Sequence, residues 1–395
     1  MKKRIFSAAL ALVMIFGVCF SFASAADEHE LQFDKNGEFR IMHLTDCQDT
    51  YPANKTMLQF IDAAIKEYEP HIVVLGGDNC VAPKESKDAA IKELCDVFVA
   101  NETYFTLVFG NHDREQKVSN DELLALYQKH GGEYCLAYDA VEELHGSGTH
   151  NLTVWNSKGD KIIYNLWMFD SGSHAYDAEG NDIGYDCVRA DQIEWYKKTS
   201  NALAEANYGK KIPSLAFQHI VVSEVYDALF YESSVDMGEL TRSFNGKTYS
   251  FFPKTENFEG FLFEFPCPGV ENEGQFQAMV DQGDVVGIFS GHDHTNGYVT
   301  EVDGIKIVNT PGATYHNYGS DFTRGMRMIT VKEGALDTFE TEIVTVNALA
   351  AANDDFAEAS GINGILGTII TVFGDILLSL GKFSGIFSNL IRPFA

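Results

Sequence analysis

Basic residues are scarce in this chain of 395 residues. Lysine and arginine number 29 against 57 aspartate and glutamate residues, and the formal net charge is −28 at pH 7. Proteins that bind nucleic acids usually carry a basic surface for the phosphates. Binding to duplex nucleic acid is therefore not expected. The acidic residues are spread along the chain, as is typical of a soluble acidic enzyme.

Closely spaced cysteine pairs are also missing, which argues against a structural zinc site. Beyond residue 25 the sequence has six cysteines, none in a Cys-x-x-Cys pair: Cys47, Cys80, Cys95, Cys135, Cys187 and Cys267. Two interpretations stay open. An exported protein can form disulfides, whereas free thiols can be buried as small hydrophobic side chains.

The first 25 residues have the three parts of a secretory signal peptide. Residues 2–4 are basic, residues 8–22 are apolar, and residues 23–25 read Ala-Ser-Ala, a small-x-small cleavage site. We predict a signal peptide over residues 1–25 and a secreted or cell-envelope protein. An uncleaved anchor is the alternative.

Short apolar runs with the length of strands are abundant. Early runs alternate with helical periods such as residues 56–68, which indicates parallel βα units through about residue 130. Later runs are mostly strands, and residues 152–155 and 162–169 are expected to pair across a turn. We predict one α/β domain over residues 26–348, in which sheets pack on each other with helices outside.

Two later segments have a different character. Residues 221–268 are rich in aromatic side chains without a clear period, so they are either a lid or substrate loop or a packed cover of the core. Residues 349–361 are small and acidic, like a linker. Residues 362–395 carry one apolar seam and predict an amphipathic helix that binds a membrane surface or associates with itself. A helix packed on its own domain is the alternative.

Polar side chains follow the ends of five strand-like runs, where ligands bind in open α/β sheets. These side chains are Asp46, Gln48, Asp78, Asn111, His112, Asp113, His219, His292 and His294. Imidazole, carboxylate and amide groups together favour ions such as Mn, Fe, Zn or Ni over calcium. The number of ligands is too large for one tetrahedral ion and suits two. A two-metal site can clamp a phosphate and supply a hydroxide for in-line attack.

The order of these residues resembles the calcineurin-like metallophosphoesterases, whose pattern is D-x-H, G-D, G-N-H-[D/E], a lone H and G-H-x-H. Here the pattern covers about residues 38 to 346 and reads Asp46-Cys47-Gln48, Gly77-Asp78, Gly110-Asn111-His112-Asp113, His219 and Gly291-His292-Asp293-His294. Flanking residues 191–195 and 274–276 are similar to the secreted single-domain branch named after purple acid phosphatases. The resemblance implies a four-layer α/β/β/α sandwich.

The resemblance also implies a role for each residue. Two divalent metal ions (Mn, Fe, Zn or Mg) would be bound, and a metal-bound hydroxide would attack the phosphate ester. His112 would protonate the leaving group, with Asp113 orienting its ring. The metal ligands fall into three sets: Asp46, Gln48 and His294 for the first ion, Asn111, His219 and His292 for the second, and Asp78 bridging both.

Two departures from the family pattern bear on activity. Gln48 stands where the family has histidine, and an amide oxygen is a harder and weaker ligand than imidazole. No tyrosine follows Asp78 closely, so the coloured ferric site of purple phosphatases is not expected.

The substrate side of the site is less defined. Arg324 is a candidate to reach the substrate phosphate, and Tyr315 and His316 are weaker candidates; loop solvation is the alternative for all three. A phosphorylated small molecule, a lipid head group and a phosphoprotein all fit as substrates. Two functions follow: a phosphoesterase, or a weak or inactive protein of this fold that binds a membrane or partner through residues 362–395.

Overall fold

The structure is a computed structural model that describes residues 31–362. The predicted signal peptide and C-terminal helix lie outside the described residues, apart from Ile362. Across residues 31–362, no helix combines the length and the apolar character needed to cross a membrane. The six cysteines of this range are all free thiols.

Five strands form the first sheet, with parallel pairing in its centre and antiparallel pairing at one side. Strands β2, β3 and β4 pair in parallel, and β17 pairs antiparallel with both β2 and β18. The order across the sheet is β18 (Ala335–Thr345), β17 (Gly325–Lys332), β2 (Glu38–Leu44), β3 (Ile72–Gly76) and β4 (Phe105–Val108).

Eight strands form the second sheet. Its central strands β6, β9, β14 and β16 are parallel, and β5 pairs antiparallel with β6, as the sequence predicts. The order is β1 (Leu31–Gln32), β5 (His150–Trp155), β6 (Ile162–Met168), β9 (Ser214–Phe217), β14 (Val285–Ser290), β16 (Ile305–Asn309), β15 (Gly297–Val302) and β13 (Phe258–Phe261).

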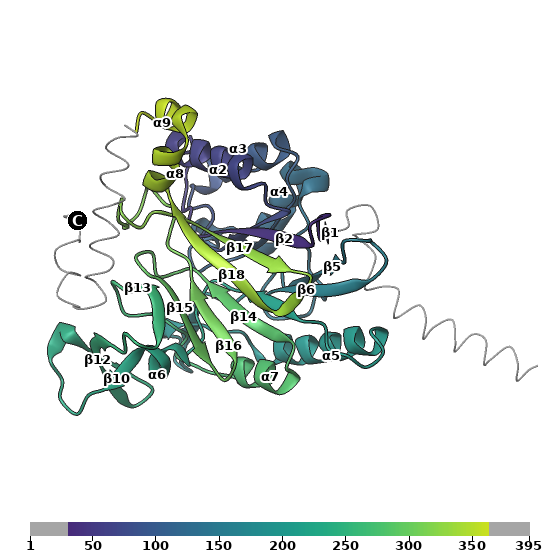
Figure 1. Ribbon diagram of the computed structural model, residues 1–395. Coiled ribbons are helices and arrows are strands. Elements are labelled where there is room, and N and C mark those ends of the chain that lie inside the picture. Colours follow the sequence, from purple (N-terminus) through teal and green to yellow (C-terminus); the bar gives the residue numbers. More distant parts are fainter. Residues whose placement is uncertain (1–30, 363–395) are drawn as a thin grey trace, which may run out of the picture.

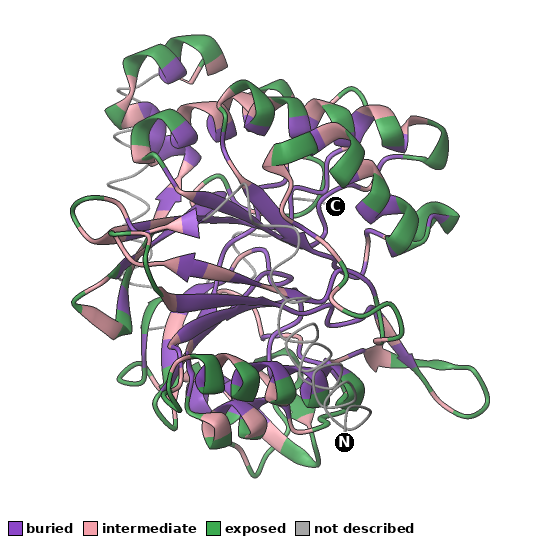
Figure 2. Cartoon of the chain, turned by 90° about the vertical axis from the view of Figure 1, so that its right-hand side faces the viewer, coloured by how far each residue is buried: buried purple, intermediate pink, exposed green. Residues whose placement is uncertain are grey.

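Helices cover the outer face of each sheet (Figure 1). The five-stranded sheet carries α2 (Lys55–Tyr68), α3 (Lys84–Ala100), α4 (Asn120–Gly131), α8 (Val346–Ala352) and α9 (Asp354–Ser360). The eight-stranded sheet carries α5 (Ala190–Ala206), α6 (Val225–Leu229) and α7 (Gln275–Gln282). Figure 2 shows the sheets as buried layers between helices with exposed outer sides. The predicted α/β sandwich of two sheets flanked by helices is confirmed.

The inner faces of the two sheets meet in an apolar core. Ile41 and Val74 of the first sheet pack with Leu166, Phe217 and Phe289 of the second, and all five side chains are fully buried. Alternating strand residues point to opposite faces, so the same strands also bury apolar side chains against the helices. The strands are therefore held on both faces, and their ends are fixed in space.

The prediction of a linker over residues 349–361 is wrong. Helices α8 and α9 occupy most of this stretch and pack on α2, where Leu349, Ala350 and Phe356 are buried. The ring of Phe356 lies 6.1 Å from that of Phe60 in α2. Small and acidic residues on the outer side hide this apolar contact in the composition. The folded domain therefore extends to residue 360.

The aromatic-rich residues 221–268 form a small extension at the side of the domain. It contains α6, edge strand β13 and a three-stranded sheet of β10 (Phe230–Glu232), β12 (Lys247–Pro253) and β11 (Thr241–Phe244). Tyr226, Phe230 and Phe251 are buried in the core on the helix side of the eight-stranded sheet. This packing favours a cover of the core over a free loop.

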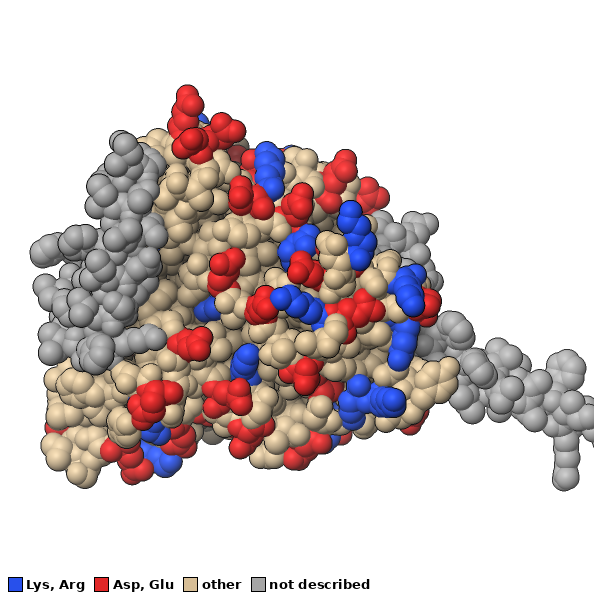
Figure 3. Space-filling view, in the orientation of Figure 1, with Lys and Arg blue, Asp and Glu red and all other residues tan. Residues whose placement is uncertain are grey.

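Charged side chains of both signs are interspersed over the face of the molecule drawn in Figure 3. Exposed ion pairs also form between neighbouring turns of single helices, with Lys66 and Asp62 paired in α2 and Lys92 and Asp96 in α3. Such pairs contribute little to stability. The surface thus agrees with the sequence, in which acidic residues are spread rather than gathered.

Candidate metal centre

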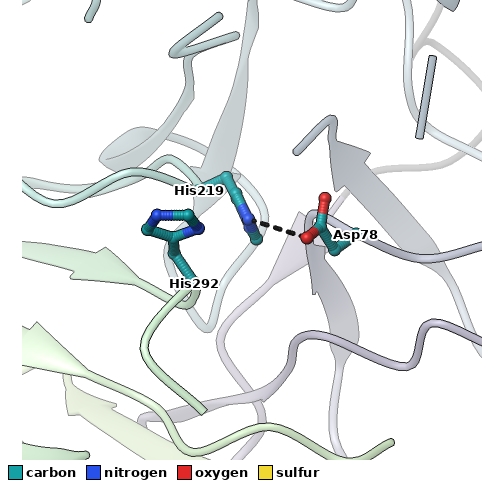
Figure 4. A group of neighbouring side chains, drawn as sticks. All are labelled: Asp78, His219 and His292. Carbon is teal, nitrogen blue, oxygen red and sulfur yellow. Dashed lines mark ion pairs between the residues drawn. The ribbon is translucent and has the colours of Figure 1, made fainter. Parts of the chain in front are cut away.

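The predicted ligands meet where strands of both sheets end. Asp46 and Asp78 lie two residues beyond β2 and β3, and Asn111 follows β4. His219 and His292 lie two residues beyond β9 and β14 of the other sheet. Figure 4 shows Asp78 facing His219 and His292 across the space between the sheets. The sandwich therefore brings together residues that are up to 248 positions apart, from Asp46 to His294.

The chain turns sharply at these strand ends. Asp46, Gln48, Asp78 and His292 all have positive φ angles, between 40° and 71°. Side chains other than glycine rarely adopt this region, and such strain concentrates at functional sites. A Cβ atom on Gly110 would overlap the carboxylate of Asp78. The motif glycine therefore lets the loops approach the ligands closely.

The ligand atoms are close enough to share bound ions. Nε2 of His219 lies 3.3 Å from Oδ2 of Asp78 and 3.9 Å from Oδ1 of Asp46. Nε2 of His294 lies 3.3 Å from Oδ1 of Asp46. One ligand atom each from Asp78, His219 and His292 lies within 4.8 Å of the others. A cation between these groups would be in reach of all of them.

Five buried atoms of the site make no hydrogen bond among the residues that the structure describes, although two of them, in Asp46 and His219, face ion-pair partners within the cluster. They are Oδ1 of Asp46, Oε1 of Gln48, Oδ1 of Asn111, Nε2 of His219 and Nε2 of His292. Buried polar atoms without a partner are costly and rare in native proteins. All five belong to the predicted ligand set, and all five can donate an electron pair to a metal. The residues present therefore fit a metal site.

The tautomers and ring positions of two histidines are fixed by contacts at their Nδ1 atoms. Nδ1 of His219 lies 2.9 Å from the carbonyl oxygen of Gly76, and Nδ1 of His294 lies 2.7 Å from that of Tyr318. The ring of Tyr318 also stacks on His294 at 4.2 Å. A carbonyl partner makes Nδ1 the protonated nitrogen and leaves Nε2 as the ligand.

The charges of the cluster hold its carboxylates ionised. Burial raises the pKa of Asp78, but the neighbouring His219 outweighs burial and the pKa is lowered. Burial lowers the pKa of His219, and the carboxylates of Asp78 and Asp46 raise it to about 10. Burial, together with repulsion from His219, lowers the pKa of His292 to about 3, so this ring is neutral. Ionised carboxylates and the neutral ring of His292 are forms that bind metals, whereas an ion bound by His219 would displace the proton on its Nε2.

The structure corrects the expected role of Asp113. Its carboxylate accepts hydrogen bonds from the backbone N–H groups of Gly110 (2.8 Å), Asn79 (2.9 Å) and Cys80 (3.2 Å). It makes no hydrogen bond to the ring of His112 among the described contacts. Asp113 therefore ties the loops after β3 and β4 together, and burial raises its pKa to about 6.

His112 lies at the open side of the cluster. Its side chain is 36% exposed, and Nε2 is 4.0 Å from Oδ2 of Asp78. Nδ1 is 2.8 Å from Oε1 of Glu115, one helical turn further along the chain. Glu115 thus orients the ring of His112, a role that the sequence analysis expected of Asp113. Spacing alone could have suggested it, because residues three apart are neighbours in a helical turn.

Gln48 is buried in the position that the sequence predicts for it. Its Nε2 donates to Oδ2 of Asp78 at 3.0 Å, and its Oε1 is one of the five atoms without a hydrogen bond. His43, the nearest imidazole in the sequence, is held between the sheets by Thr310 at 2.8 Å. Gln48 is therefore the side chain that occupies the family's histidine position.

Arg324 is engaged in holding its own loop. Its Nε donates to the carbonyl oxygen of Thr314, and its guanidinium pairs with Asp321. The guanidinium also lies 4.2 Å from the ring centre of Tyr315. His316 pairs with Asp49 at 2.8 Å. None of these described contacts reaches a predicted metal ligand. The structure thus gives the three candidates structural partners, and the predicted contact with substrate stays a prediction.

Two mixed sheets flanked by helices, with a buried Asp/His cluster where both sheets end, define the metallophosphoesterase fold. The sequence profile of the calcineurin-like phosphoesterases matches residues 39–296. The chain belongs to the calcineurin-like phosphoesterase family.

Similar proteins from Arabidopsis thaliana are named as probable inactive purple acid phosphatases. The chain is 26% identical over 385 residues to "Probable inactive purple acid phosphatase 14", covering 86% of this chain and 89% of that protein. It is 26% identical over 340 residues to "Probable inactive purple acid phosphatase 29", covering 78% and 80%.

Two solved structures show a distant likeness. A dimetal phosphatase from Danio rerio has a TM-score of 0.45 at 13% identity, covering 78% of this chain and 99% of that one. GAP50, described as the anchor in the inner membrane complex of Plasmodium, has a TM-score of 0.44 at 12% identity, covering 78% and 85%.

Proposed function

We propose that the protein is a secreted metal-dependent phosphoesterase that hydrolyses a phosphate ester with two divalent metal ions. The observation that carries this proposal is the set of five buried candidate ligand atoms that make no hydrogen bond, gathered at the ends of strands from both sheets. The predicted signal peptide in residues 1–25 supports export.

The ligands divide into two sets around Asp78. Asp46, Gln48 and His294 would hold the first ion, and Asn111, His219 and His292 the second. Asp78 lies between them, with Oδ2 facing both Gln48 and His219. When bound, the two ions would neutralise the phosphate charge and lower the pKa of an attacking water.

His112 is suited to protonate the leaving group. It is the most exposed side chain of the site, and Glu115 holds Nδ1 so that Nε2 faces Asp78. A proton on Nε2 would pass to the oxygen of the departing alcohol as its bond to phosphorus breaks. Because Asp113 is bound to backbone groups, the contact that would position this ring comes from Glu115.

Hydrolysis of an aryl phosphate by metal-depleted protein, with and without added Mn²⁺, tests the proposal. We expect Mn²⁺-dependent turnover that is lost in Asp78→Ala. Asp337→Ala, which changes an exposed carboxylate far along the chain in β18, serves as the control. Absence of turnover with mono- and diesters, or full activity in Asp78→Ala, would overturn the proposal.

Gln48 favours a second candidate, a catalytically weak protein of this fold that works by binding. The replacement of an imidazole ligand weakens the first metal position, and the Arabidopsis relatives are named as probable inactive. Binding would use residues 362–395, for which a membrane surface or a second copy of the chain is the expected partner. This candidate predicts less than one metal ion per chain.

Vesicle binding tests the tail separately from the metal site. The full-length chain should bind liposomes, and a chain truncated after Gly361 should not. Equal binding by both chains, or no binding by either, would refute the role of residues 362–395.

A further inference from the structure

A pocket with two basic side chains opens beside His112. It has a volume of about 360 Å³, within the range of small-molecule sites. It is lined by Arg114, Lys117, Val118, Ser119, Asn120, Gly146 and Ser147. In a chain with nearly twice as many acidic as basic residues, two cations at one pocket stand out.

The loop that carries His112 continues into the lining of the pocket. Arg114 lies two residues after His112, and its Nη2 is 3.8 Å from Oδ1 of Asp170. The loop of Asp170 also carries Ser173, whose Oγ donates to the carbonyl oxygen of the predicted ligand Asn111 at 3.2 Å. The pocket is therefore connected to the metal centre through the loop from His112 to Arg114 and through the contact of Ser173 with Asn111.

Arg114 has hydrogen-bonding capacity to spare. Its Nε and Nη2 are buried and have no hydrogen-bond partner among the described residues. Asp170, its nearest acid, already accepts from the backbone N–H groups of Gly172 and Ser147 at 2.9 Å each and from Asn120 at 3.2 Å. Asp170 is thus hydrogen-bonded by other donors and meets Arg114 only as an ion pair at 3.8 Å, which leaves N–H groups of the guanidinium available to an anion.

Lys117 adds a second charge at the exposed rim. Its carbonyl oxygen accepts from Nζ of Lys84 at 3.4 Å, which brings a further cation to the same turn. Three acids of the region are hydrogen-bonded elsewhere and do not line the pocket: Glu115 with His112, Asp121 with Ser147 and Glu122 with Ser119. The only charged residues among the described ones that line the pocket are therefore the two basic ones, Arg114 and Lys117.

We propose that this pocket binds a second anionic group on the leaving part of the substrate, a carboxylate or a phosphate. The inference rests on the proposed function and narrows its substrate class to small phosphate esters whose alcohol carries a negative charge. Arg114 would hold that charge while His112 protonates the ester oxygen a few atoms away.

Matched substrates test the inference by activity. Glycerol 3-phosphate has an uncharged alcohol, 3-phosphoglycerate adds a carboxylate, and glycerol 1,3-bisphosphate adds a phosphate. We expect kcat/KM to favour one or both charged esters, and Arg114→Gln to lower that preference by about tenfold or more. Arg114→Lys should keep part of it, and Lys158→Gln, an exposed lysine of the β5–β6 turn, should not change it.

A binding measurement separates the inference from the proposed function. Metal-depleted protein is titrated calorimetrically with inorganic pyrophosphate, which needs no catalysis. We expect binding by the wild type and Lys158→Gln, and binding weakened about tenfold by Arg114→Gln or Lys117→Gln in folded protein. Equal binding by all four, or an unchanged substrate preference, would overturn the inference. Loss of all turnover with pyrophosphate binding intact would overturn the proposed function alone.

Discussion

Gln48 is the residue on which the proposed activity depends most. The other predicted ligands are the types that the family uses, whereas Gln48 offers an amide oxygen in place of an imidazole nitrogen. Its Nε2 donates to the bridging Asp78, so its Oε1 is left to face the first metal position. The geometry therefore permits ligation, and the chemistry of the amide makes it weak.

Restoring the histidine should strengthen the first metal position. A positive φ of 40° at this position is tolerated by histidine. We expect Gln48→His to tighten Mn²⁺ binding by at least about tenfold. Mutation of a residue that only contacts a metal ligand already changes metal affinity by about that factor. Calorimetric titration of metal-depleted protein measures this, with Gln48→Ala as the control that weakens binding. Equal affinity in wild type and Gln48→His would contradict a ligand role for this position.

Asp113 and Glu115 should respond differently to removal. Asp113→Ala leaves three buried N–H groups without a partner, so we expect a loss of at least about 3 kcal/mol in the free energy of unfolding. Glu115→Ala frees the ring of His112, so we expect kcat to fall by up to about 100-fold with stability unchanged. Chemical denaturation and steady-state kinetics distinguish the two. A catalytic loss in Asp113→Ala without a loss of stability would contradict this assignment.

The gathering of the candidate ligands could be predicted from the sequence, but their supporting contacts could not. Asp46, Asp78 and His219 directly follow apolar runs, and strand ends converge in any α/β sandwich. The partner of His112, the stacking of Tyr318 on His294 and the engagement of Arg324 depend on how loops fold back. No spacing rule fixes the path of a loop, so these contacts appear only in the structure.

At the scale of elements, long periodic segments were predictable and short ones were not. Residues 56–68 carry apolar side chains at helical spacing and form α2 as expected. Helices α8 and α9 have seven residues each, too few for a period to be recognised. Their place is decided by Leu349 and Phe356, which fill the surface of α2.

Truncating Phe356 should therefore destabilise the domain. Its side chain is buried, with 3% of its surface exposed. We expect Phe356→Ala to cost about 3–5 kcal/mol of unfolding free energy, the usual range for a buried phenylalanine. Denaturant titration measures the loss, and truncation after Gly361, which leaves α9 complete, is the control. A change below about 1 kcal/mol would show that α9 behaves as the linker predicted from composition.

At the scale of the whole molecule, polar contacts tie the two sheets together. Nε2 of His150 in β5 is 2.7 Å from Oγ1 of Thr106 in β4, and Nδ1 is 2.7 Å from the carbonyl oxygen of Gly148. Arg327 in β17 donates to the carbonyl oxygen of Asn309 in β16 at 2.8 Å. These contacts fix the relative position of the sheets, on which the metal centre between them depends.

Acid should weaken this junction through His150. Burial lowers its pKa to about 4 from an ordinary value of 6.5, because the ring is held neutral. Below pH 6.5 the unfolded chain binds a proton at this histidine, whereas the folded chain does not. The free energy of unfolding therefore falls as the pH drops from about 6.5 to 4, by up to about 1.4 kcal/mol per pH unit. Denaturation of wild type and His150→Gln across this range checks it. Parallel pH curves for the two proteins would contradict the assignment.

The central claim is that the buried atoms without a hydrogen bond at the strand ends are metal ligands. Elemental analysis of the full chain after reconstitution with Mn²⁺ and removal of excess metal tests it most directly. We predict two ions per chain in the wild type and a clear loss in Asp78→Ala, with Asp337→Ala unchanged. Fewer than one ion per chain in the wild type, or an equal content in Asp78→Ala, would contradict the claim.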